Sequence, residues 1–165
     1  MNMKINCKIN NKNKELTISE TDTLDEVLRS IGELSVKKGC DQAFCNACMI
    51  LFNDEVVPSC VVLALTAKDA SIVTLEHFVT TPDYGDIAKA FEECNLHFCG
   101  YCNAGKVFSA YHIIRKNLRP TKEDIYGYIK NLACSCTELE DFARAVQMAA
   151  TLRRNRLGTR KYDKK

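Results

Sequence analysis

The chain has 165 residues, which is enough for one domain or two small ones. Apolar residues make up 46% and charged residues 27%, a balance typical of folded globular proteins that argues against extensive disorder. The formal net charge of +2 is too small for a nucleic-acid-binding surface, and no apolar run reaches the roughly 18–20 residues that span a bilayer. We therefore expect neither a nucleic acid nor a membrane as a partner.

Residues 1–76 predict a small α+β domain. Apolar and polar side chains alternate over residues 4–9, which indicates a half-buried strand, and a polar turn follows at 10–14. Apolar residues at helical spacing predict a helix over 24–31. The other expected elements are short strands at 16–18, 49–52, 55–57 and 71–75 and a short helix at 61–67. A hairpin followed by a helix and further strands favours a β-grasp domain.

Residues 77–83 are predicted to be a linker, and residues 84–152 a helical domain. Four apolar stripes recur there at helical spacing, starting at Ile87, Val107, Ile125 and Leu139. Four amphipathic helices with short connections predict a four-helix bundle. Two helix starts carry a capping-box pattern: Thr121 with Asp124, and Thr137 with Glu140. Residues 153–165 hold seven basic residues and one acid, and we expect this basic tail to be frayed.

The ten cysteines are the unusual feature of this composition. The N-terminal residues lack the apolar core of a secretory signal, so we expect a cytoplasmic protein, in which metal binding is commoner than disulfides. Eight cysteines form two groups, one in each expected domain: Cys40, Cys45, Cys48 and Cys60, then Cys99, Cys102, Cys134 and Cys136. Cys7 and Cys94 lie outside both groups on apolar stripes, where cysteine commonly serves as a small buried hydrophobe.

The spacing of the two groups favours iron–sulfur clusters. The first group, C-x4-C-x2-C-x11-C, begins with the plant-type ferredoxin spacing, in which four thiolates hold a [2Fe–2S] cluster. The second group contains a C-x-C pair, unlike the C-x2–4-C pairs of structural zinc sites. Zinc sites, structural thiols and disulfides remain alternatives at this point.

Both groups, in this order, resemble the small iron–sulfur subunit of the molybdenum hydroxylases, the family of xanthine dehydrogenase and aldehyde oxidoreductase. The resemblance covers residues 3–150 and rests on four stretches: 39–48, 58–60, 99–105 and 131–137. It implies a β-grasp domain with one [2Fe–2S] cluster, a helical domain with a second, all eight cysteines as ligands and no catalytic residue on this chain. It also implies a hetero-oligomer, with molybdopterin on a large partner subunit and FAD on a flavin subunit.

The family implies a function in electron transfer. Electrons would pass from the molybdopterin centre through the helical-domain cluster and the β-grasp cluster towards a flavin or another acceptor. Two other functions fit the residues: a zinc-binding assembly or interaction module, and a free-standing ferredoxin-like carrier. The substrate pocket of the family lies on another subunit, so this sequence does not name the substrate.

The chain departs from the family pattern beside several ligands. Ala43 and Asn46 replace the two glycines of the first loop. Asparagine tolerates a left-handed backbone, whereas a positive φ at Ala43 would cost ~1 kcal/mol. Phe98 replaces the glutamine that contacts the pterin in the family. The remaining replacements are Asn103-Ala104 for Thr-Pro, Ser135 for Arg and Glu138 for Gly.

Overall fold

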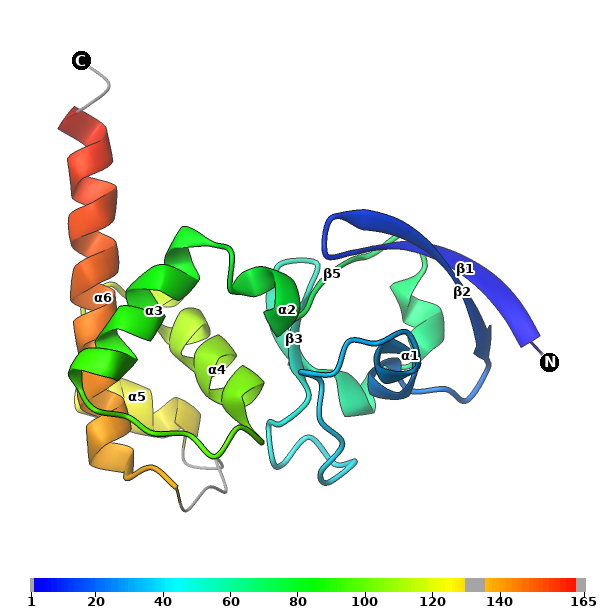
Figure 1. Cartoon of the computed structure of the whole chain (residues 1–165), viewed down its shortest axis with the longest axis horizontal. Helices are drawn as coiled ribbons and strands as arrows, with labels where there is room; N and C mark the ends of the chain where they lie inside the picture. The colour runs from blue at the N-terminus through cyan, green and yellow to red at the C-terminus, as the bar shows by residue number, and fades with distance from the viewer. Residues whose placement is uncertain (1, 130–135, 163–165) are drawn as a thin grey trace.

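The computed structural model describes residues 2–129 and 136–162 and has two halves in chain order (Figure 1). A five-stranded sheet with one helix packed against it forms the N-terminal half, and helices form the C-terminal half. The predicted α+β fold with a β-grasp half and a helical half is therefore confirmed. Within the described ranges, no helix is long and apolar enough to cross a membrane.

The sheet has the strand order β2-β1-β5-β3-β4. Its strands are β1 (Asn2–Ile9), β2 (Lys12–Ser19), β3 (Met49–Phe52), β4 (Glu55–Pro58) and β5 (Ser71–Val73). The hairpin β1–β2 is antiparallel with Ile5 opposite Leu16, and β5 runs parallel to β1 and antiparallel to β3. The alternation seen in the sequence holds, because Ile5, Cys7 and Ile9 are all buried on one face.

Helix α1 (Leu24–Ser30) packs on that face and completes the first core. Its start is fixed by a capping box between Thr23 and Glu26. The single short helix expected at 61–67 is instead two 3-10 turns, η1 (Ser59–Val61) and η2 (Ala64–Ala67). Because Cys48 and Cys60 are buried in this same core, the sheet half holds two of the predicted ligands rigidly.

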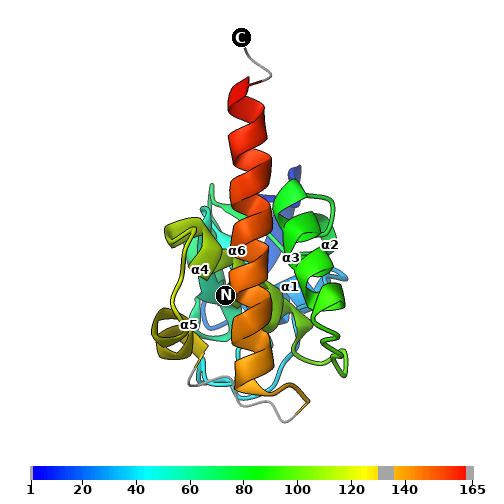
Figure 2. The ribbon, with the colours of Figure 1, turned by 90° about the vertical axis from the view of Figure 1, so that its left-hand side faces the viewer.

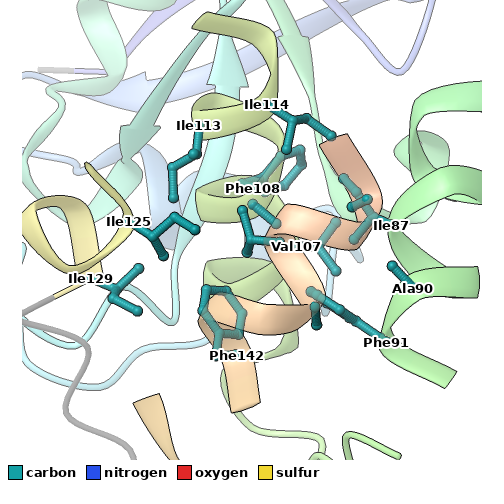
Figure 3. Packing of buried hydrophobic residues seen from close by; sticks show 14 of the residues in the cluster. Ile87, Ala90, Phe91, Val107, Phe108, Ile113, Ile114, Ile125, Ile129 and Phe142 are labelled. Carbon is teal, nitrogen blue, oxygen red and sulfur yellow. The ribbon is translucent and has the colours of Figure 1, made fainter. Parts of the chain in front are cut away.

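The helical half contains α2 (Leu75–Phe78), α3 (Pro82–Glu93), α4 (Asn103–Lys116), α5 (Lys122–Ile129) and α6 (Leu139–Tyr162). Helices α3 to α6 pack around a second core made largely of isoleucine, phenylalanine and alanine (Figure 3). The expected linker at 77–83 is largely helical, since α2 covers its first residues and α3 begins at Pro82. The Thr81 side chain accepts a hydrogen bond from Tyr84 N, and proline suits the first helical position. Helix α3 therefore begins at Pro82, inside the expected linker.

Strand β3 belongs to both cores. Ile50 is buried in the core of the sheet half, whereas its neighbours Met49 and Leu51 are buried in the core of the helical half. Successive side chains of a strand point to opposite faces, so one short strand can serve both. Helix α4 packs directly against β3, which places the two halves in extensive contact.

The C-terminal tail differs from the prediction of a frayed end beginning at Arg153. Helix α6 continues to Tyr162 and passes along the whole helical half, as Figure 2 shows. Arg153 Nε lies 3.0 Å from Asp83 Oδ1, and Arg156 Nε lies 2.8 Å from Asp86 Oδ2. These ion pairs with α3 tie the first tail residues to the body, although their partners are some 70 residues away in sequence.

Candidate iron–sulfur sites

The first cysteine group lies in the irregular loop between α1 and β3 and in the turn η1 after β4. Cys40 and Cys45 are partly exposed, whereas Cys48 and Cys60 are buried, and all four are free thiols. The fully buried Ser59 donates from its backbone N and from Oγ to Cys48 O, at 3.1 and 2.7 Å. These two hydrogen bonds hold the segment that carries Cys60 against the segment that carries Cys48.

Backbone N–H groups converge on the sulfur of Cys40. The N–H groups of Phe44 and Cys45 each donate to Cys40 Sγ over 3.2 Å. The N–H of Cys45 and the other backbone donors of the loop lower the pKa of the Cys40 thiol to about 7. Burial raises the pKa of Cys45, and it raises the pKa of Cys60 to about 11. At neutral pH the thiols of Cys45 and Cys60 would therefore stay protonated unless a bound cation such as iron stabilised their thiolates.

The backbone of this loop adopts the left-handed turns that the sequence analysis considered. Ala43 has φ +57° and Asn46 has φ +56°, at the two positions where the family has glycine. The expected strain of ~1 kcal/mol at Ala43 is therefore present, whereas asparagine carries less of it. These turns curl residues 40–48 back on themselves, which is how the amides of residues 44 and 45 come to face Cys40.

The second group lies at one end of the helical half. Cys99 is exposed in the segment before α4, and Cys102 is buried and caps that helix. Cys136 is exposed, three residues before α6 begins. A lysine on α4 joins the two segments, since Lys106 Nζ lies 3.1 Å from Cys136 Sγ. Cys134, the remaining predicted ligand, lies outside the described residues.

The two cysteine loops touch each other. Tyr101, between Cys99 and Cys102, donates its hydroxyl to Lys38 O over 2.6 Å. Gly105 on α4 packs so closely on the first loop that a Cβ there would collide with the carbonyl oxygen of Asn46 and lie 3.0 Å from its carbonyl carbon. The start of α4 thus rests directly on the first cysteine loop (Figure 1).

The donor set of the first loop fits a [2Fe–2S] cluster. Four thiols and two sulfur-directed N–H groups are what such a cluster requires for ligation and for hydrogen bonding to sulfur. Among residues 2–129 and 136–162, no three His, Cys, Asp or Glu side chains are spaced to surround a single metal ion. A two-iron cluster distributes its four thiolates over two metal atoms, so its ligands need not converge on one point.

Cys7 and Cys94 lie in the apolar cores and belong to neither cysteine group. Cys7 is buried in the core of the sheet half, and burial raises its pKa. Cys94 Sγ lies 3.9 Å from Met148 Sδ, among partly buried residues of the helical core. We expect Cys7→Ala and Cys94→Ala to keep the full iron content, at a cost of ~1–2 kcal/mol in the free energy of unfolding. Iron analysis and urea unfolding measure both, and loss of iron from Cys94→Ala would identify it as a ligand.

Lys106 is a site residue that the sequence analysis missed. Lys106 is only 2% exposed. Its ammonium contacts Cys136 Sγ and also donates a hydrogen bond to Thr137 Oγ1 over 2.7 Å. The predicted pairing of Thr137 with Glu140 is not observed, because Glu140 binds Lys122 instead. The sequence does carry a signal: Lys106 shares a helical face with Ala110 and Ile113, which are both buried, although the predicted apolar stripe of this helix starts at Val107.

Known proteins match the chain over nearly its whole length. Residues 74–147 match the family described as [2Fe-2S] binding domain. The small FeS subunit of nicotinate dehydrogenase from Eubacterium barkeri is 32% identical over 146 residues, which are 88% of this chain and 93% of that subunit.

Solved structures agree with these matches. A chain of quinoline 2-oxidoreductase from Pseudomonas putida superposes with a TM-score of 0.82 and 28% identity, covering 93% of this chain and 97% of that one. Aldehyde oxidoreductase from Desulfovibrio desulfuricans superposes with a TM-score of 0.80 and 30% identity, covering 92% of this chain but 17% of that longer chain.

The two cysteine loops, the fold and these relatives together place the chain in the class of [2Fe–2S] iron–sulfur proteins. The chain belongs to the small iron–sulfur subunits of the molybdenum hydroxylase family. It is therefore an electron-transfer subunit of an oxidoreductase, as the resemblance implied.

Proposed function

We propose that this chain relays electrons through two [2Fe–2S] clusters. The proposed ligands of the first cluster are Cys40, Cys45, Cys48 and Cys60, and those of the second are Cys99, Cys102, Cys134 and Cys136. The observation that carries this proposal is the contact between the two cysteine loops, at Gly105 with Asn46 and at Tyr101 with Lys38. Two redox centres on touching loops are close enough to exchange electrons.

Each bound cluster would supply the one-electron redox chemistry, and the residues of this chain set its surroundings. Burial of Cys48, Cys60 and Cys102 keeps water from part of each site. The N–H groups directed at Cys40 Sγ favour negative charge on that sulfur and so stabilise a reduced cluster. The close contact between the two cysteine loops, at Gly105 with Asn46, keeps the two sites at a fixed separation.

The partners follow from the relatives and remain part of the proposal. The matched relatives include small subunits of nicotinate dehydrogenase and of nicotine 6-hydroxylase. We infer a hetero-oligomer in which a large molybdopterin subunit gives electrons to the second cluster and a flavin subunit receives them from the first. The aldehyde oxidoreductase chain supports this inference. Its matched part is only 17% of its length, so in that protein the equivalent of this chain is joined to a much larger remainder. A cytoplasmic location stays a prediction from the sequence.

Metal and sulfide content tests the proposal directly. Protein purified without air is expected to contain about four iron and about four sulfide per chain, the sum for two [2Fe–2S] clusters. Dithionite is expected to bleach the visible spectrum and to produce two electron paramagnetic resonance signals. Zinc in place of iron would establish the zinc-binding module instead. Two clusters without a co-purifying large subunit would favour the free-standing carrier.

A further inference from the structure

A buried positive charge lies beside the second cysteine group. Lys106 belongs to the first turns of α4 and is 2% exposed. Its ammonium lies 3.1 Å from Cys136 Sγ and 2.7 Å from Thr137 Oγ1, and it lies over the ring of Phe98, 4.3 Å from the ring centre. A thiol sulfur, a hydroxyl oxygen and an aromatic face are thus among the groups in contact with the ammonium, and each presents electron density to it.

Burial of an ammonium is costly, and packing alone does not explain it. A buried lysine loses the hydration of its charge, whereas methionine or leucine would fill the same space without that cost. The neighbouring residues of α4 show what packing needs here, since Ala104, Val107 and Phe108 are all buried and apolar. A lysine in this position is explained if negative charge gathers at its tip.

We propose that Lys106 is a positioning residue that raises the reduction potential of the second cluster. The inference rests on the proposed function, because it takes Cys136 as an iron ligand. On reduction one electron enters the cluster from the donor, no bond forms or breaks, and the site gains one negative charge. An ammonium held against a ligand sulfur attracts that added charge, so it stabilises the reduced form more than the oxidised form.

Phe98 and Thr137 hold the ammonium in place. The ring of Phe98 packs edge-to-face on Phe91, with 5.1 Å between the ring centres, and covers one side of the ammonium. Thr137 follows Cys136 directly, so its hydroxyl anchors Lys106 at the ligand segment itself. Because Phe98 excludes water on one side, the charge acts in a medium of lower dielectric constant than the solvent, where its effect on the cluster is larger.

The test compares three variants of the full chain, loaded with clusters and purified without air. Lys106→Met removes the charge and keeps the length, and Lys106→Arg keeps the charge. Lys116→Met removes an exposed lysine at the far end of the same helix and serves as the control. The readout is a redox titration in which electron paramagnetic resonance follows each cluster separately.

Lys106→Met is expected to lower the equilibrium constant for reduction of the second cluster about tenfold, which is about 59 mV for one electron. The first cluster is expected to be unchanged in every variant. Lys106→Arg is expected to shift the second cluster by less than half as much as Lys106→Met, and Lys116→Met is expected to leave it at the wild-type value.

An unchanged second potential in Lys106→Met would overturn the inference. If Lys106→Met lost the second cluster, Lys106→Arg would decide. A retained cluster near its wild-type potential would support the role of the charge, whereas loss in both variants would assign Lys106 to packing. Failure of the proposed function is distinguishable, because the wild-type chain would then show no second signal at all.

Discussion

Cys45→Ser will remove the electron paramagnetic resonance signal of the first cluster and leave that of the second. Serine oxygen is a poor replacement for thiolate in an iron–sulfur cluster, and serine keeps the backbone N–H that Cys45 donates to Cys40 Sγ, so the change removes the ligand sulfur alone. The iron content is expected to fall from about four to about two per chain, because one of two [2Fe–2S] clusters is lost. Iron analysis and spectra of the dithionite-reduced protein measure both effects.

The reciprocal change is Cys102→Ser, in the buried cap of α4. It is expected to remove the second signal and to spare the first, again with loss of about half the iron. Cys7→Ser is the matched control, since it makes the same substitution at a buried cysteine outside both loops. Loss of both signals from either ligand variant would show that the two sites do not form independently.

Gly105→Ala will destabilise the protein strongly for a single methyl group. The new Cβ would collide with backbone atoms of Asn46, and backbone yields less easily than the end of a flexible side chain. Overpacking of this kind costs ~1–3 kcal/mol, and we expect the upper half of that range because the loop is already strained at Ala43 and Asn46. The midpoint of urea unfolding of the cluster-loaded protein measures the effect.

Gly127→Ala on α5 is the matched control. It is the same substitution at an exposed position of a helix, and nothing lies within 4 Å of the position of its Cβ. Alanine is the better helix former, so the control is expected to be stabilised by ~0.5–1 kcal/mol. Equal stability of the two variants would contradict the contact between α4 and the first cysteine loop.

Local patterns predicted most of the secondary structure. Strict alternation around Ile5 and Leu16 specified the hairpin, and helical spacing through Ile87 and Ile125 specified α3 and α5. Thr121 with Asp124 forms the predicted reciprocal cap, with N···O distances of 3.0 and 3.1 Å. Each of these signals lies within a few residues of the structure that it determines.

Other features depend on contacts between distant residues, which no local pattern records. The extension of α6 past Arg153 is stabilised by Asp83 and Asp86 on α3, and the role of Gly105 depends on the curl of a loop some sixty residues earlier. The same holds for the candidate sites. Cysteine spacing grouped the ligands, whereas the burial of Lys106 beside Cys136 became visible only once α4 and the start of α6 were packed together.

The shared strand β3 has a consequence for how electrons move. Since Met49 and Leu51 lie in one core and Ile50 in the other, the two halves cannot swing apart without exposing apolar side chains of both. Tunnelling rates fall steeply with distance, and a hinge between redox centres would make each transfer wait for closure. A strand shared by both cores opposes such a hinge motion, so we expect the rate of transfer between the two sites not to depend on the viscosity of the solvent.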